Sequence, residues 1–155
     1  MRKIQVRAGH DGYNAQLDRT RRFLERVEGK HENDVAFQDI IWSFFQHCWH
    51  LEDWVKNDDS VHQTQKDAVR KAVDASRDLQ ICRSLCIHTK HLRARRGARH
   101  SHVDIDITPG QSTVMDCFID DGEGNLISGK ELARRCVGEW ERILQAHGLT
   151  IDRLS

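Results

Sequence analysis

The chain has 155 residues, of which 38% are apolar and 31% charged, and it contains a single proline. This length supports one domain over residues 1–155 with its own hydrophobic core, and the scarcity of proline argues against a β-sandwich. The 24 basic and 24 acidic side chains cancel. No window is apolar enough for a membrane span, and the amino terminus is too polar for a signal peptide. We therefore expect a cytoplasmic protein that does not enter a membrane.

The five cysteines favour a reduced compartment. Their number is odd, most of them fall in segments that read as amphipathic helices, and no Cys-x-x-Cys pair is present. Cys82 and Cys86 are one helical turn apart, a spacing more typical of core packing than of metal binding.

The first half of the chain reads as helices. A short charged helix is predicted at residues 14–29, and a weaker one at residues 62–75. The strongest pattern lies between them, where apolar side chains recur every three or four positions from Phe37 to Val55 and predict a core-facing helix over residues 34–55. Ser76 suits the N-cap of a further helix that passes Leu92 and ends near Arg96.

The periodicity then changes. Residues 102–108 alternate between apolar and polar and predict a strand, residues 113–120 predict a second, and Pro109-Gly110 makes the turn between them. A turn at residues 121–125 leads to a short strand at residues 126–127. Ser128 and Glu131 form a capping box for a last helix that ends at His147-Gly148. The fold class is therefore mainly α (α+β): a bundle of four to five helices with a small antiparallel β element, at about residues 102–127, before the C-terminal helix.

Positive charge is concentrated in one stretch. Residues 79–103 contain no Asp or Glu, although the two charge signs balance over the whole chain. The basic residues expected to bind an anion, and phosphate in particular, are Lys90, Arg93, Arg95, Arg96 and Arg99. The alternative is that these arginines only complement the dipole of a helix that ends before Gly97. The absence of acids favours anion binding, because solvated faces normally mix both signs.

Two His-x-x-His pairs define a second candidate site. His47 and His50 lie on one predicted helix and His88 and His91 on another, and a spacing of three places both rings of a pair on one face. Four imidazoles could bind a divalent metal. The alternative is a packed, hydrogen-bonded His47 with exposed partners, and the helical wheel favours that alternative. No organic cofactor motif is present.

The third candidate is catalytic. Arg83 and His88 form an Arg-x4-His motif beside the basic stretch, and here the chain resembles the HEPN class of small helical-bundle domains, many of which cleave RNA as dimers. The resemblance implies that His88 is the general acid/base and that Arg83 stabilises the phosphate in the transition state. The same spacing occurs elsewhere in this chain, and Ser follows Arg83 where the HEPN pattern usually has Asn, Asp or His. In an unbroken helix, Arg83 shares a face better with His91 than with His88.

A broader resemblance covers the middle third of the chain. Residues 43–54 (SFFQHCWHLEDW) and 89–92 (TKHL) are similar to a group of small uncharacterised bacterial and phage-associated proteins. This resemblance selects His50, Asp53, Lys90 and His91 but implies no chemistry. Asp53 could orient the imidazole of His50, or could belong to a solvated helix face. Trp42, Trp49 and Trp54 could stack on nucleobases, although tryptophans at helical spacing are more often core or interface residues.

Three classes of function follow. The first is an RNA- or nucleotide-binding protein, or an RNA-cleaving HEPN-like enzyme, that uses Arg83, His88 and His91. The second is a non-enzymatic interaction module of the antitoxin, immunity or phage accessory type that uses its basic surface on an anionic partner. The third is a metal protein with histidine ligands. The long apolar faces are compatible with a homodimer in each case.

Overall fold

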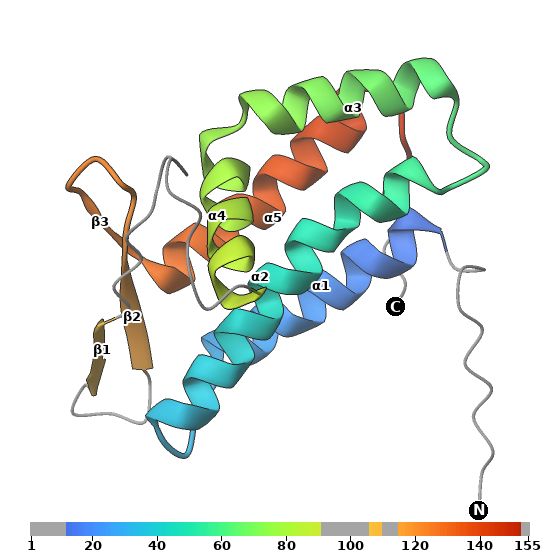
Figure 1. The fold of residues 1–155 in the computed structure, drawn as a ribbon. Helices are drawn as coiled ribbons and strands as arrows, with labels where there is room; N and C mark the ends of the chain where they lie inside the picture. The colour runs from blue at the N-terminus through green and yellow to red at the C-terminus, as the bar shows by residue number, and fades with distance from the viewer. Residues whose placement is uncertain (1–11, 91–105, 110–114, 153–155) are drawn as a thin grey trace, which may run out of the picture.

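The computed structural model describes residues 12–90, 106–109 and 115–152. Within these ranges the chain forms five helices and three strands (Figure 1). The helices are α1 (Tyr13–Glu28), α2 (Asp34–Lys56), α3 (Gln63–Ala75), α4 (Arg77–Lys90) and α5 (Gly129–Ala146). The strands are β1 (Asp106–Pro109), β2 (Met115–Asp120) and β3 (Leu126–Ser128), and they precede α5. The predicted fold class, a mainly helical bundle with a small β element before the last helix, is confirmed.

Helix α2 is the longest helix and packs against α1, α4 and α5. Asn33 caps its start by accepting a hydrogen bond from the backbone N–H of Ala36 at 2.8 Å. Its inner face carries the apolar side chains that the sequence pattern identified, and Phe37, Phe44 and Leu51 are completely buried. The outer face of α2 is exposed between α1 and α4, so α2 is both the centre of the core and part of the surface (Figure 1).

Helix α5 closes the core from the opposite side. Its predicted inner face is confirmed, since Leu132, Cys136, Trp140, Ile143 and Leu144 all have no exposed area. Residues 147 and 148 end the helix as predicted, and Gly148 takes a positive φ of 73° that suits glycine. α3 runs alongside α5 at the side of the bundle away from α1 (Figure 1).

The three strands form an antiparallel sheet in the order β1-β2-β3 at one end of the bundle (Figure 1). The predicted strand at 102–108 extends into residues that the structure does not describe, and Pro109 pairs with Met115 as the last residue of β1. Asp121 holds the turn after β2, because its carboxylate accepts backbone hydrogen bonds from Glu123 and Asn125 at 2.8 and 3.1 Å.

The junction between sheet and bundle is tight. Ser128 caps α5 by accepting from the N–H of Glu131 at 3.2 Å, which is the N-cap half of the predicted capping box. Asp116 on β2 adds a contact that the sequence did not reveal, since it accepts from the N–H of Lys130 at 3.1 Å and from the Ser128 hydroxyl. A carboxylate at this position also complements the positive end of the helix dipole.

Candidate functional site

Arg83, the arginine of the predicted catalytic motif, lies on α4 and points across to α2. Its side chain is exposed, and its guanidinium carbon lies 5.5 Å from the centre of the Trp49 ring. A cation at this distance over an indole face is attracted by the ring quadrupole. The contact holds the arginine at the surface with its charge still open to solvent.

A second arginine–tryptophan pair lies on the other flank of α2. The guanidinium carbon of Arg19, on α1, is 5.6 Å from the centre of the Trp54 ring. At about 100° per residue, His50 and Asp53 fall between the two tryptophans on the exposed side of α2. We call the surface formed by Arg19, Trp49, His50, Trp54 and Arg83 the α2 face.

The tryptophans have the packing role considered from the sequence, and stacking on nucleobases stays a prediction. Trp42, Trp49 and Trp54 are partly buried and pack against the hydrophobic core. Trp49 and Trp54 also support the guanidinium groups of the α2 face. They are therefore packed residues whose outer edges contribute to the surface.

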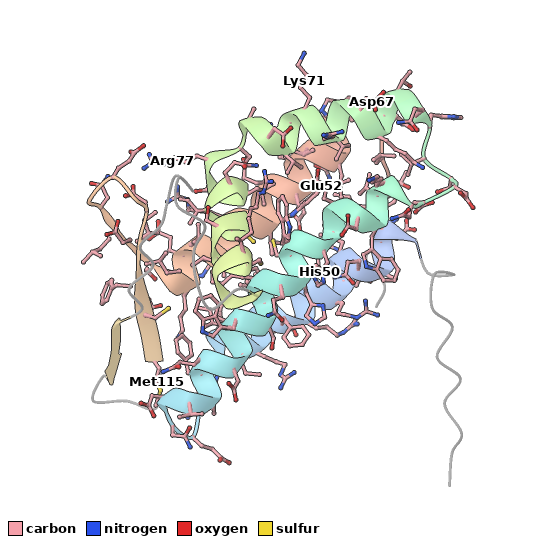
Figure 2. All side chains as sticks on the ribbon, in the orientation of Figure 1. His50, Glu52, Asp67, Lys71, Arg77 and Met115 are labelled. Carbon is pink, nitrogen blue, oxygen red and sulfur yellow. The ribbon has the colours of Figure 1, made fainter. Side chains whose placement is uncertain are left out.

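The two histidines of α2 differ sharply. The His47 ring stacks on Phe23 with 4.5 Å between centroids, and its Nδ1 lies 3.5 Å from the amide nitrogen of Gln16. Burial, together with Arg19 and His50 nearby, lowers the pKa of His47. His50, by contrast, is exposed, and Figure 2 shows it on the outer side of α2. A packed His47 with an exposed His50 is the arrangement expected if these two histidines do not bind a metal.

Several of the predicted site residues lie partly or wholly outside the residues that the structure describes. His88 and Lys90 belong to α4, but the positions of their side chains are not described. His91, Arg93, Arg95, Arg96 and Arg99 follow α4 and lie wholly outside the described residues. The four-histidine metal site and the pairing of Arg83 with His88 or His91 therefore stay predictions. Asp53 is exposed on α2, and among the described side chains no hydrogen bond joins its carboxylate to His50.

An arginine-lined pocket opens where α3 and α4 meet α5. Its volume is about 450 Å³, and its walls include Arg77, Arg135 and Arg142. Each of these guanidinium groups is already paired with a carboxylate: Arg77 with Asp121 and Glu123, Arg135 with Asp78, and Arg142 with Glu139. The internal ion pairs reduce the attraction of this pocket for an external anion.

The most compact group of chemically reactive side chains is in the core. Cys48 from α2, Cys82 from α4 and Cys136 from α5 are fully buried, and their three sulfur atoms all lie within 4.8 Å of one another. All five cysteines are free thiols. We call Cys48, Cys82 and Cys136 the thiol cluster. It is the one group of three potential metal ligands among the described residues.

Hydrogen bonds order the thiol cluster. The thiols of Cys82 and Cys136 donate to the backbone carbonyls of Phe45 and Asp78 at 3.3 and 3.5 Å. Burial and contact with the other thiols raise the pKa of Cys82. Burial also tends to raise the pKa of Cys48, but its interactions with the thiols of Cys136 and Cys82 outweigh burial and lower that pKa.

The one-turn spacing of Cys82 and Cys86 predicted core packing, which is confirmed, but no pattern in the sequence predicted the thiol cluster. Its members are separated by 34 and 54 positions, and no local spacing motif connects them. The sequence gives a weaker indication of the thiol cluster: each of its three cysteines falls on the inner face of a helix with a clear apolar pattern.

Compared with known proteins, the chain matches no family model, and neither a curated protein nor a solved structure matches it. None of the helices in the described part of the chain has the length and apolar character needed to cross a membrane. Fold and site define a mainly helical α+β protein with a buried thiol cluster and an arginine–tryptophan surface on its longest helix.

Proposed function

We propose that this protein binds RNA through the α2 face and the basic stretch that follows α4. The observation that carries the proposal is the Arg83–Trp49 pair, in which an exposed guanidinium group lies over the ring of a partly buried tryptophan. Proteins that bind single-stranded nucleic acid combine cations for the phosphates with aromatic rings for the bases. The basic stretch adds Lys90, the last residue of α4, and then Arg93, Arg95, Arg96 and Arg99, which follow α4 in the sequence.

The acid nearest Arg83 limits the extent of this surface. Glu52 on α2 is half-buried, and burial, with Asp74 and Asp53 nearby, raises its pKa, whereas Arg83 and Arg70 act in the opposite direction. Figure 2 shows Glu52 on the side of α2 toward α3, whereas His50 lies farther from α3. Because a polyanion is repelled by Glu52, the proposed RNA path runs from Arg83 toward His50 and the end of α4.

Binding is tested with a fluorescently labelled single-stranded RNA, with anisotropy measured over a range of salt concentrations. The logarithm of the association constant should fall linearly with the logarithm of the salt concentration, because each neutralised phosphate releases counterions. Arg83→Ala should weaken binding about tenfold, equivalent to about 1.4 kcal/mol. The matched control is Arg142→Ala, because Arg142 is also exposed but pairs with Glu139 on α5.

Trp49→Leu separates stacking from charge. Leucine keeps an apolar side chain against the core but removes the aromatic face, so RNA binding should weaken while the fold is retained. Binding that does not respond to salt, or equal effects of Arg83→Ala and Arg142→Ala, would refute the proposal.

The same experiment separates binding from cleavage. If the protein is a HEPN-like enzyme, it degrades the RNA, and His88→Ala or His91→Ala abolishes degradation while binding persists. In the non-enzymatic version, the RNA remains intact and only the arginine variants have an effect.

A further inference from the structure

We propose that Cys48, Cys82 and Cys136 form a site for a divalent thiophilic metal ion, with Zn²⁺ as the ion whose ligand preference fits. The site is independent of RNA binding on the α2 face. It also differs from the histidine site predicted from the sequence, because its ligands are sulfur atoms inside the core.

The geometry is close to that of a thiolate metal site. In a tetrahedral zinc site with Zn–S bonds of about 2.3 Å, neighbouring sulfur atoms are about 3.8 Å apart. The three sulfur atoms of the thiol cluster already lie within 4.8 Å of one another. Each sulfur–sulfur distance would have to shorten by at most about 1 Å, which small side-chain rotations can supply.

A fourth sulfur is adjacent. Cys86 lies one helical turn after Cys82 and is almost completely buried. Its thiol donates to the Phe45 carbonyl at 3.1 Å, the same oxygen that accepts from Cys82. Cys86 lies outside the group of three sulfurs, so it can remain protonated and keep its bond to the Phe45 carbonyl after Cys82 has lost its proton.

The surroundings of the thiol cluster favour a divalent ion over a monovalent one. The thiol cluster belongs to the hydrophobic core, and Trp140, one of its completely buried apolar members, lies against Cys48. For any given set of thiolates, a divalent ion leaves one negative charge fewer than monovalent Cu(I), and an unpaired buried charge is costly. Binding exchanges thiol protons for metal–sulfur bonds: the ligand thiols release their protons to solvent, and no atom is oxidised or reduced.

Metal binding would connect three separate helices. Cys48, Cys82 and Cys136 come from α2, α4 and α5, so an ion bound to all three would resist separation of these helices. Because the thiol cluster has no exposed area, the ion must enter during folding or a transient opening. The apoprotein should therefore be loaded by refolding in the presence of the metal.

The test uses untagged full-length protein, unfolded with a reductant and a chelator and then refolded with or without Co²⁺ as a probe for Zn²⁺. We expect one Co²⁺ per chain and an intense thiolate-to-metal charge-transfer band, which surface histidines do not produce. Zn²⁺ should displace Co²⁺ and bleach the band. The refolded zinc form should melt at a higher temperature than the apoprotein, because the ion binds the native state.

The control variant changes Cys117. Cys117→Ala removes a buried thiol on β2 that does not belong to the cluster, and should leave the cobalt band intact. Cys48→Ala and Cys136→Ala should each abolish it. If these variants fail to fold, the wild-type protein alone decides the question. A wild-type protein that refolds with substoichiometric Co²⁺, no charge-transfer band and no rise in melting temperature with Zn²⁺ would overturn the proposal.

Discussion

The indole Nε1–H of Trp140 donates a hydrogen bond to the backbone carbonyl of Cys48 at 3.1 Å, joining α5 to α2 in the middle of the core. Trp140 has no exposed area, so neither partner can turn to water instead. The Cys48 carbonyl lies inside α2 and also accepts the helical hydrogen bond from the N–H four residues later, so the indole N–H is a second donor whose loss removes an interhelical hydrogen bond. This bond fixes the relative position of two helices that carry members of the thiol cluster.

Replacing Trp140 by phenylalanine should therefore be costly. The change removes the donor and leaves a cavity beside Cys48, and we expect a loss of about 2–4 kcal/mol in the free energy of unfolding. Urea denaturation followed by circular dichroism measures it. Trp42→Phe is the comparison, because Trp42 is only partly buried, and its loss should be smaller. Equal losses would show that the bond to Cys48 contributes little.

Gly129 should not tolerate a side chain. A Cβ atom at this position would lie 2.2 Å from the Cys117 sulfur and 2.8 Å from Cδ1 of Ile41. Gly129→Ala should thus push β2 and α2 away from the start of α5 and destabilise the protein by about 1–3 kcal/mol, as overpacking does.

Gly138 provides the matched control within the same helix. A Cβ atom there meets nothing within 4 Å, and alanine favours a helix interior over glycine by about 0.5–1 kcal/mol. Gly138→Ala should therefore raise the melting temperature while Gly129→Ala lowers it. The prediction fails if the two substitutions shift the melting temperature in the same direction.

Ser76 was identified from the sequence as the N-cap of the fourth helix, and the structure gives it two bonds. Its Oγ accepts from the N–H of Leu79 at 3.4 Å and donates to Glu139 on α5 at 2.7 Å. Ser76→Ala should cost about 1 kcal/mol of unfolding free energy. Ser84→Ala, in the interior of the same helix, removes a bond to the Gln80 carbonyl and should be close to neutral. Thermal unfolding of both variants tests this contrast.

The sequence predicted the elements well because their signals are local. The apolar period from Phe37 to Val55 and the caps at Ser76 and Ser128 depend only on near neighbours, and all three features appear in the structure. The strands predicted before and after the turn at Asp121 are also present, and β2 and β3 end and begin close to the expected positions.

The contacts of the candidate sites could not be predicted because they depend on how helices cross. Arg83 and Trp49 are 34 positions apart, and their contact requires a particular orientation of α4 against α2. The thiol cluster requires three helices to point one face each at a common centre. Apolar periodicity shows which face of a helix is buried, but not which side chain of another helix it meets.

Acid should unfold this protein partly through Asp121. Hydrogen bonds from the backbone of Glu123, together with Asn125 and the nearby Arg77, lower the pKa of Asp121 to about 2. An unfolded aspartate has a pKa of about 3.9. Because the folded pKa is the lower one, the carboxylate stabilises the folded state above pH 4, and this stabilisation is lost as the pH falls from about 4 to about 2.

Asp121→Asn tests this dependence. The amide NH₂ would face the donors of Asn125 and Arg77, so the variant should be less stable than the wild type at neutral pH. The difference should shrink as the pH falls toward 2, because the wild-type carboxylate then becomes protonated. Arg77→Gln should have a smaller effect, since the Glu123 backbone bond contributes most to the lowered pKa. Melting temperatures from pH 7 to pH 2 measure all three proteins, and a stability difference that stays constant with pH would contradict this role of Asp121.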